Sequence, residues 1–182
     1  MPISRFIVMI CISLISIVLS PITMASHRAG AAILSLGAGY ERFSSKRHID
    51  NTGMPFFALG YDLTDNWGVE GFLGLTSTDS RRPEDDGRQI KTTLFTFDGV
   101  YHFSPYHKVE PYVLAGVGIT GMHPNGRSDA NNEGNINAGV GAEIFIAKSI
   151  AFRLEARDLY TIVSSYNDVL VSGGISFLFD LC

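Results

Sequence analysis

The sequence has the length of one domain and a composition that excludes several classes of protein. It contains 182 residues, of which 46% are hydrophobic and 18% charged, with a formal net charge of -4. This hydrophobic content is too high for a disordered chain, and the slight acidity argues against a basic nucleic-acid-binding protein. The 19 glycines and only 7 prolines favour many strands joined by tight turns over a helical fold.

The first 25 residues have the pattern of a secretory signal peptide. Arg5 precedes an apolar run over 6–19, and the small-residue site Thr23-Met24-Ala25 follows it. A positive charge, an apolar stretch of roughly 7 to 15 residues and small residues before the cleavage point define such a peptide, whereas a spanning helix needs about 20 apolar residues. We predict cleavage after Ala25, export through the inner membrane, and a mature domain over 26–182 that keeps a single cysteine and must be stabilised without an internal disulfide.

From Ala31 onward, apolar and polar residues alternate in segments of about 9 to 14 residues, as in strands that separate two environments. The mature sequence has no apolar run of the roughly 18 residues that a transmembrane helix requires. We predict eight strands, at about 31–43, 54–63, 67–77, 90–103, 110–122, 135–145, 150–161 and 168–179.

The connections between these strands alternate in length. Long polar connections are expected at 44–53, 78–89 and 123–134, with a shorter one at 162–167, and tight ones at 64–66, 104–109 and 146–149. An up-and-down membrane barrel has this alternation when its odd connections face the medium and its even ones face the periplasm.

The composition of the strand faces indicates which face points inward. In "FRLEARD" (152–158), Arg153, Glu155 and Arg157 alternate with apolar residues, so one face of the strand carries only charge. In other strands, glycine, small hydroxyls and charge oppose a large apolar face. A soluble lipocalin-type barrel, the alternative, needs exteriors rich in Lys, Glu, Asn and Gln, whereas small and charged residues suit a narrow lumen. The predicted fold is therefore all-β: an eight-stranded antiparallel up-and-down transmembrane β-barrel.

Four segments resemble the outer membrane protein A type N-terminal barrel, of the outer-membrane beta-barrel domain family. They are "GYDLTDNWGVEGFLGL" (60–75), "YHFSPYHKVEPYVLAGVGIT" (101–120), "NAGVGAEIFIAKSIAFRLEARD" (137–158) and "VLVSGGISFLF" (169–179). The resemblance implies a location in the outer membrane of a Gram-negative bacterium. The partners it implies are outer-membrane lipids, lipopolysaccharide and the barrel-insertion machinery, with a surface ligand of the outer loops as a further candidate.

Six charged residues are predicted on the lumen faces: Glu70, Asp98, Glu143, Arg153, Glu155 and Arg157. Buried charges must pair, because an isolated one costs several kcal/mol or more. We favour a structural salt-bridge cluster that fills the interior, since eight strands leave room for little besides side chains. The alternative is a narrow ion channel, like the gated ion path proposed for the resembled family.

One motif suggests catalysis. His102-Phe103-Ser104 resembles the His-x-Ser pair that, with a Glu, serves as the esterase site of the eight-stranded lipid A deacylases. A serine nucleophile needs a base within about 2.6 to 3.2 Å. However, a periplasmic turn is the wrong rim for outer-leaflet lipid A, and Ser104 before Pro105 suits an ordinary turn. We expect a structural or surface-interaction role without catalysis, and a lipid A-modifying esterase is the alternative.

No cofactor, metal or nucleic-acid partner is expected. The five histidines, His27, His48, His102, His107 and His123, are scattered without ligand spacing, and no nucleotide-binding fingerprint is present.

Overall fold

The structure is a computed structural model, and it describes residues 29–45, 50–79, 89–103, 105, 107–124, 131–163 and 165–180. The predicted signal peptide over residues 1–25 lies outside this range. Within it, no helix has the length and apolar character needed to cross a membrane.

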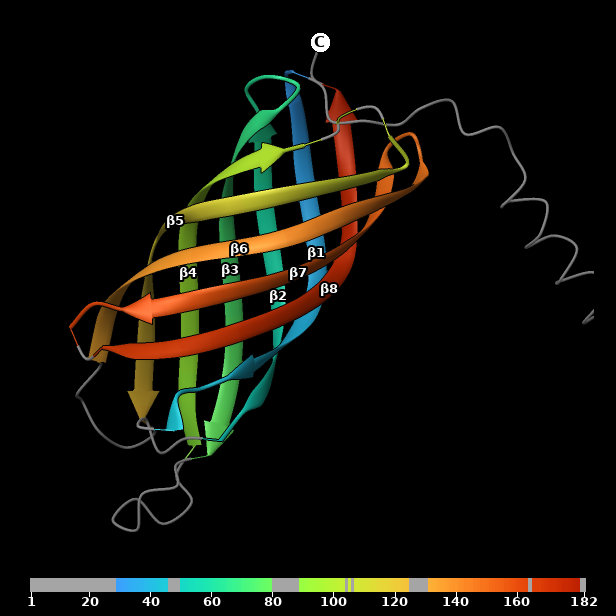
Figure 1. The fold of residues 1–182 in the computed structure, drawn as a ribbon. Helices are drawn as coiled ribbons and strands as arrows, with labels where there is room; N and C mark the ends of the chain where they lie inside the picture. The colour runs from blue at the N-terminus through green and yellow to red at the C-terminus, as the bar shows by residue number, and fades with distance from the viewer. Residues whose placement is uncertain are drawn as a thin grey trace, which may run out of the picture.

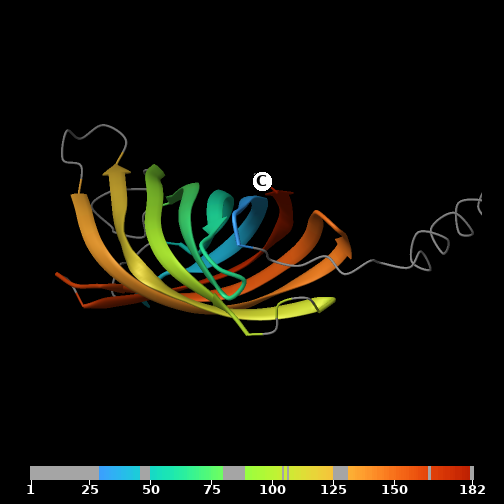
Figure 2. The same ribbon diagram turned by 90° about the horizontal axis from the view of Figure 1, so that it is seen from above.

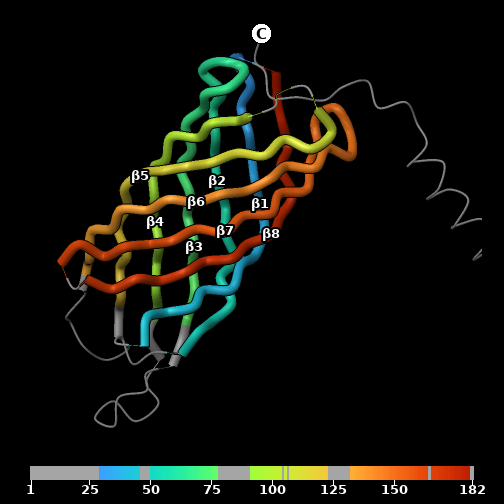
Figure 3. The backbone as a smooth tube through the Cα atoms, viewed as in Figure 1, coloured from blue at the N-terminus to red at the C-terminus, as the bar shows by residue number. Residues whose placement is uncertain are grey.

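Eight strands form a closed sheet, as Figures 1 and 3 show. They are β1 (Ala31–Arg42), β2 (Thr52–Asp62), β3 (Trp67–Asp79), β4 (Gln89–His102), β5 (Val109–Pro124), β6 (Asn131–Ala147), β7 (Ile150–Thr161) and β8 (Tyr166–Asp180). Each strand is antiparallel to the next, and β8 pairs back with β1. The predicted fold class is confirmed.

The largest difference from the predicted boundaries lies between β5 and β6. The connection expected at 123–134 is shorter, because β5 continues to Pro124 and β6 begins at Asn131, so that Met122 pairs with Asn131 and Thr120 with Glu133. The polar, glycine-containing sequence of this stretch suggested a loop. Its backbone nevertheless continues the ladder between the two strands, which lengthens this side of the barrel.

Side chains alternate between lumen and exterior along each strand, in the sense that the sequence predicted. On β4, Phe95 and Phe97 are 48% and 56% exposed on the outside, while Thr96 and Asp98 are each 0% exposed in the lumen. Large apolar side chains cover the outer face of the other strands as well. A broad apolar exterior around a polar interior is the pattern of a barrel surrounded by lipid.

Glycines allow the sheet to close. Gly37 on β1 pairs with Gly174 on β8, and a Cβ added at Gly37 would overlap the carbonyl oxygen of Gly173. Figure 2 shows how strongly the sheet curves around the barrel. The close approach of β1 and β8 requires residues without side chains at this seam.

The two ends of the barrel differ. β1 begins and β8 ends at the end that carries the short connections 63–66, 103–108 and 148–149. The opposite end carries the connections 43–51, 80–88, 125–130 and 162–165. We call these the short-turn end and the long-loop end.

Candidate functional site in the barrel lumen

All six charged residues predicted on the lumen faces lie inside the barrel, and each is at most 5% exposed: Glu70, Asp98, Glu143, Arg153, Glu155 and Arg157. Alternation along β7 directs Arg153, Glu155 and Arg157 inward as one column. On the wall of the lumen opposite β7, Glu70 on β3 and Asp98 on β4 are direct cross-strand neighbours. Two adjacent carboxylates would repel each other, and the β7 arginines supply the opposing charge.

Arg153 binds Glu70 through two parallel hydrogen bonds. Its Nη2 donates to Oε1 of Glu70 at 2.8 Å, and its Nη1 donates to Oε2. It also donates to Glu155 on its own strand, and more weakly to Ser35 Oγ at 3.4 Å. The fork of the guanidinium matches the two oxygens of a carboxylate, and this geometry fixes both side chains.

Arg157 makes the second set of contacts. Its Nη1 donates to Asp98 Oδ2 at 2.8 Å and to Thr96 Oγ1 at 2.6 Å, and its Nε donates to Glu155 Oε1 at 3.1 Å. Its Nη2 lies 3.0 Å from Glu155 and 3.5 Å from Glu70. Glu155 therefore stands between the two arginines and joins their contacts into one network.

Three neutral side chains complete the network, and they were not among the site residues predicted from the sequence. Tyr112 donates its hydroxyl to Glu155 at 2.8 Å, Asn137 donates to Asp98 at 2.9 Å, and Thr96 donates to the other oxygen of Asp98 at 2.8 Å. All three occupy inward positions of the two-residue repeat, which is the signal that could have found them. We call these three residues and the five charged residues the lumen network, which has eight members: Glu70, Thr96, Asp98, Tyr112, Asn137, Arg153, Glu155 and Arg157.

Glu143 lies beside the lumen network, towards the short-turn end. It accepts a hydrogen bond from Ser176 at 2.7 Å, and Ser176 is 2.9 Å from Ser35. In the strand register, Glu143 pairs with Arg153 on β7 and with Glu110 on β5. Of the six charged residues, five thus belong to one network and Glu143 continues it along β6.

Apolar layers bound the lumen network. On the long-loop side, buried apolar side chains form one cluster: Met54, Phe56, Ala58, Phe72, Leu94, Leu159 and Leu170. The rings of Phe56 and Phe72 stack at 5.0 Å, and the guanidinium carbon of Arg157 lies 4.5 Å from the centroid of Phe72. On the short-turn side, Ile33, Phe145, Ala151 and Leu178 form a second cluster. We call the first cluster the apolar plug.

A small cavity lies between the network and the short-turn end. Its volume is about 20 Å³, which is room for about one water molecule. Its lining includes Asp62, His102, Tyr112, Glu143 and Arg153. A space of this size can hold water beside the network, but it is too small for a substrate molecule.

The residues considered for esterase chemistry are only partly described. His102 is 4% exposed inside the lumen, where its ring centroid lies 5.7 Å from that of Tyr112. Ser104 lies outside the described residues. Within the described part of the chain, no group of three or more His, Cys, Asp or Glu side chains could hold a metal ion.

Comparison with known proteins identifies both the family and the fold. A family model of the outer membrane protein beta-barrel domain matches residues 12–177. Among solved structures, the outer membrane protein OprG of Pseudomonas aeruginosa is 15% identical, with 84% of this chain and 97% of that chain covered and a TM-score of 0.67.

Two further structures have the same fold. The N-terminal barrel of OprF from Pseudomonas aeruginosa is 16% identical, with 83% of this chain and 98% of that chain covered and a TM-score of 0.61. The attachment invasion locus protein Ail of Yersinia pestis, solved in complex with the heparin analogue sucrose octasulfate, is 17% identical, with 83% and 99% covered and a TM-score of 0.59. At these identities the likeness shows the fold alone.

Proposed function

Since the chain belongs to the outer membrane protein beta-barrel domain family, as its resembling segments predicted, we propose that it is a sealed barrel with a structural or surface-interaction role. The family assigns it to the outer membrane. Export by a signal peptide cleaved after Ala25 is part of the proposal.

The filled lumen is the observation that carries this proposal. The lumen network crosses the interior from β7 to β3 and β4, and the apolar plug lies directly beyond it. Separating one buried ion pair costs about 3–5 kcal/mol, since each charge is then left in a poorly hydrated space. Water would also have to enter a cluster of apolar side chains. The buried ion pairs and the apolar plug are two successive barriers along the lumen, and both oppose a permanent path for ions.

The outer surface is the remaining place for a function. Connections of a membrane barrel carry recognition, and the two longest connections, 43–51 and 80–88, lie at the long-loop end. Ail, of the same fold, is a protein solved with a sulfated sugar analogue bound. By analogy, we propose that lipopolysaccharide surrounds this end and that a surface ligand binds to its loops.

A conductance measurement tests the sealed lumen. Wild-type protein in planar lipid bilayers should give no steady single-channel steps, whereas Phe72→Ala with Leu94→Ala, which thins the apolar plug, should give more frequent openings. Leu154→Ala, on the lipid-facing side of β7 and 57% exposed, is the matched control. Steady steps from wild-type protein that persist in every preparation would contradict the proposal.

A narrow cation channel is the second candidate, because acids dominate the lumen. Among the described residues, nine buried carboxylates face two buried arginines. The carboxylates are Glu41, Asp62, Glu70, Asp98, Glu110, Glu133, Glu143, Glu155 and Asp168. A path through such an interior would attract cations. If wild-type conductance is found, selectivity for cations over anions would therefore favour this alternative.

An esterase is not favoured. His102 points into the lumen beside Tyr112 and not towards lipid. Incubation of the folded protein with lipid A and analysis of released acyl chains tests this part. Release that disappears in His102→Gln would replace the proposed role with catalysis.

A further inference from the structure

We propose that the short-turn end carries a binding site for one anionic phospholipid of the periplasmic leaflet, with its phosphate between Lys108 and Lys148. The inference rests on the proposed membrane barrel and adds a specific lipid contact to it. The lysines belong to neighbouring connections: Lys108 immediately precedes β5, and Lys148 immediately follows β6.

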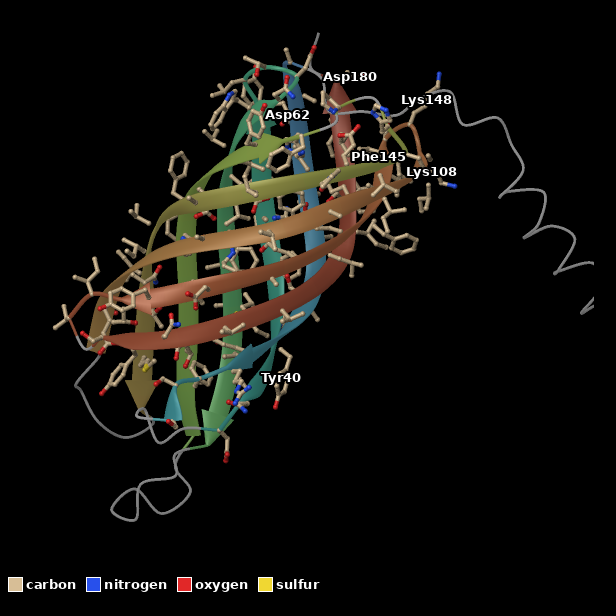
Figure 4. The ribbon with its side chains drawn as sticks, viewed as in Figure 1. Tyr40, Asp62, Lys108, Phe145, Lys148 and Asp180 are labelled. Carbon is tan, nitrogen blue, oxygen red and sulfur yellow. The ribbon has the colours of Figure 1, made fainter. Side chains whose placement is uncertain are left out.

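The backbone holds the two lysines at one corner of the barrel. The carbonyl of Lys108 accepts a hydrogen bond from the amide of Phe145 at 2.9 Å, which places it against β6 three residues before Lys148. Figure 4 shows both side chains extending away from the barrel at this corner. Both are exposed, and neither forms a salt bridge with any residue that the structure describes.

An apolar surface for acyl chains begins directly beside these lysines. Val109, Ile144 and Phe152 are consecutive neighbours in the register of β5, β6 and β7, on the outer face. Val109 is 48%, Ile146 44% and Phe152 47% exposed. Cations next to an apolar surface match a ligand with an anionic headgroup and hydrocarbon tails.

The charge around the rim favours this corner over the others. Acidic residues occupy the β1, β2 and β8 side of the short-turn end, where Asp65 accepts a hydrogen bond from the Ala29 amide and Asp180 is exposed. An anionic headgroup is repelled there and attracted to the corner of Lys108 and Lys148. The exposed His107 precedes Lys108 in the same connection, so no acidic side chain adjoins Lys108 on that side.

Lipid titration followed by native mass spectrometry tests the site. The folded protein, released from detergent micelles, is titrated with phosphatidylglycerol or with zwitterionic phosphatidylcholine, and the bound equivalents are counted. One phosphatidylglycerol should bind in preference to phosphatidylcholine. A lysine near an anionic headgroup gives about a five-fold gain in affinity, so Lys108→Gln with Lys148→Gln should weaken binding by roughly ten-fold or more.

Matched variants make the result specific. Lys91→Gln removes an exposed lysine near the long-loop end of β4 and should bind phosphatidylglycerol like wild type, and Lys108→Arg with Lys148→Arg should retain the preference. Inorganic phosphate should not compete, because it lacks the acyl chains. Equal binding by the double glutamine variant, or equal weakening by Lys91→Gln, would overturn the site.

The mobility of unboiled samples on denaturing gels separates two kinds of failure. If every variant is heat-modifiable and lipid binding is unchanged, the barrel stands and the lipid site is wrong. If wild-type protein itself gives no compact unboiled form, the proposed membrane barrel fails first.

Discussion

Glu70 and Arg153 are 83 residues apart in the chain, and their side chains meet across the lumen in a two-pronged ion pair. Both are at most 5% exposed, so each charge depends on the other for the interactions that water would otherwise provide. Removal of one partner therefore leaves a buried charge without its partner, whereas removal of both leaves none.

We expect Arg153→Met to lower the free energy of unfolding by about 3–5 kcal/mol, because it leaves Glu70 buried without its main counter-charge. Arg153→Glu should lower it further or raise single-channel conductance, since the cluster becomes repulsive. Arg153→Met combined with Glu70→Leu should recover most of the loss. Urea unfolding in lipid vesicles, followed by fluorescence of the single tryptophan, Trp67, measures all three.

The double variant provides the control in this set. If its loss equals the sum of the two single losses, Arg153 and Glu70 are not coupled. An unchanged unfolding midpoint together with unchanged conductance in Arg153→Glu would show that Arg153 does not belong to such a cluster.

Tyr112→Phe should have a smaller effect. It removes only the hydroxyl that donates to Glu155 at 2.8 Å, and a hydrogen bond to a charged group contributes about 1.5–3 kcal/mol. Tyr101→Phe, on the outer face of β4, changes the same atoms outside the lumen and should cost less. Comparison of the two unfolding free energies checks the prediction, which is contradicted if Tyr101→Phe is the more damaging change.

The sequence predicted the sheet well because a barrel wall repeats every two residues. Alternation identified the inward positions, including Asp98 and Arg157, without any knowledge of their partners. The partners themselves depend on the register and stagger of the closed sheet, which join β7 to β3 and β4 across the lumen. Tyr112 was missed for the same reason, since alternation identifies it as an inward residue but does not show that its hydroxyl meets Glu155.

The glycine seam gives a third prediction. Gly37→Ala should reduce the yield of heat-modifiable, folded barrel, because its Cβ would overlap the Gly173 carbonyl where β1 meets β8. Gly134→Ala on β6 is the matched control, since nothing lies within 4 Å of its added Cβ. Densitometry of unboiled gels after refolding measures both. Equal yields would mean that the seam can open enough to admit a methyl group.

The orientation of the barrel is the last prediction, and it determines which rim meets the medium. If the short-turn end faces the periplasm, trypsin added to intact cells should cut the connection 80–88 after Arg81, since the bond between Arg82 and Pro83 resists trypsin, or cut the connection 125–130 after Arg127. It should spare Lys108 and Lys148, whose connections lie at the other end. The barrel should survive nicking, because its strands remain paired around the closed sheet.

Trypsin added after permeabilisation should reach both rims and serves as the positive control. Cleavage at Lys108 from outside, with Arg81 protected, would invert the topology. Such an inversion would place Lys108 and Lys148 against lipopolysaccharide, and it would place His102 near the outer rim, where an esterase would have to act.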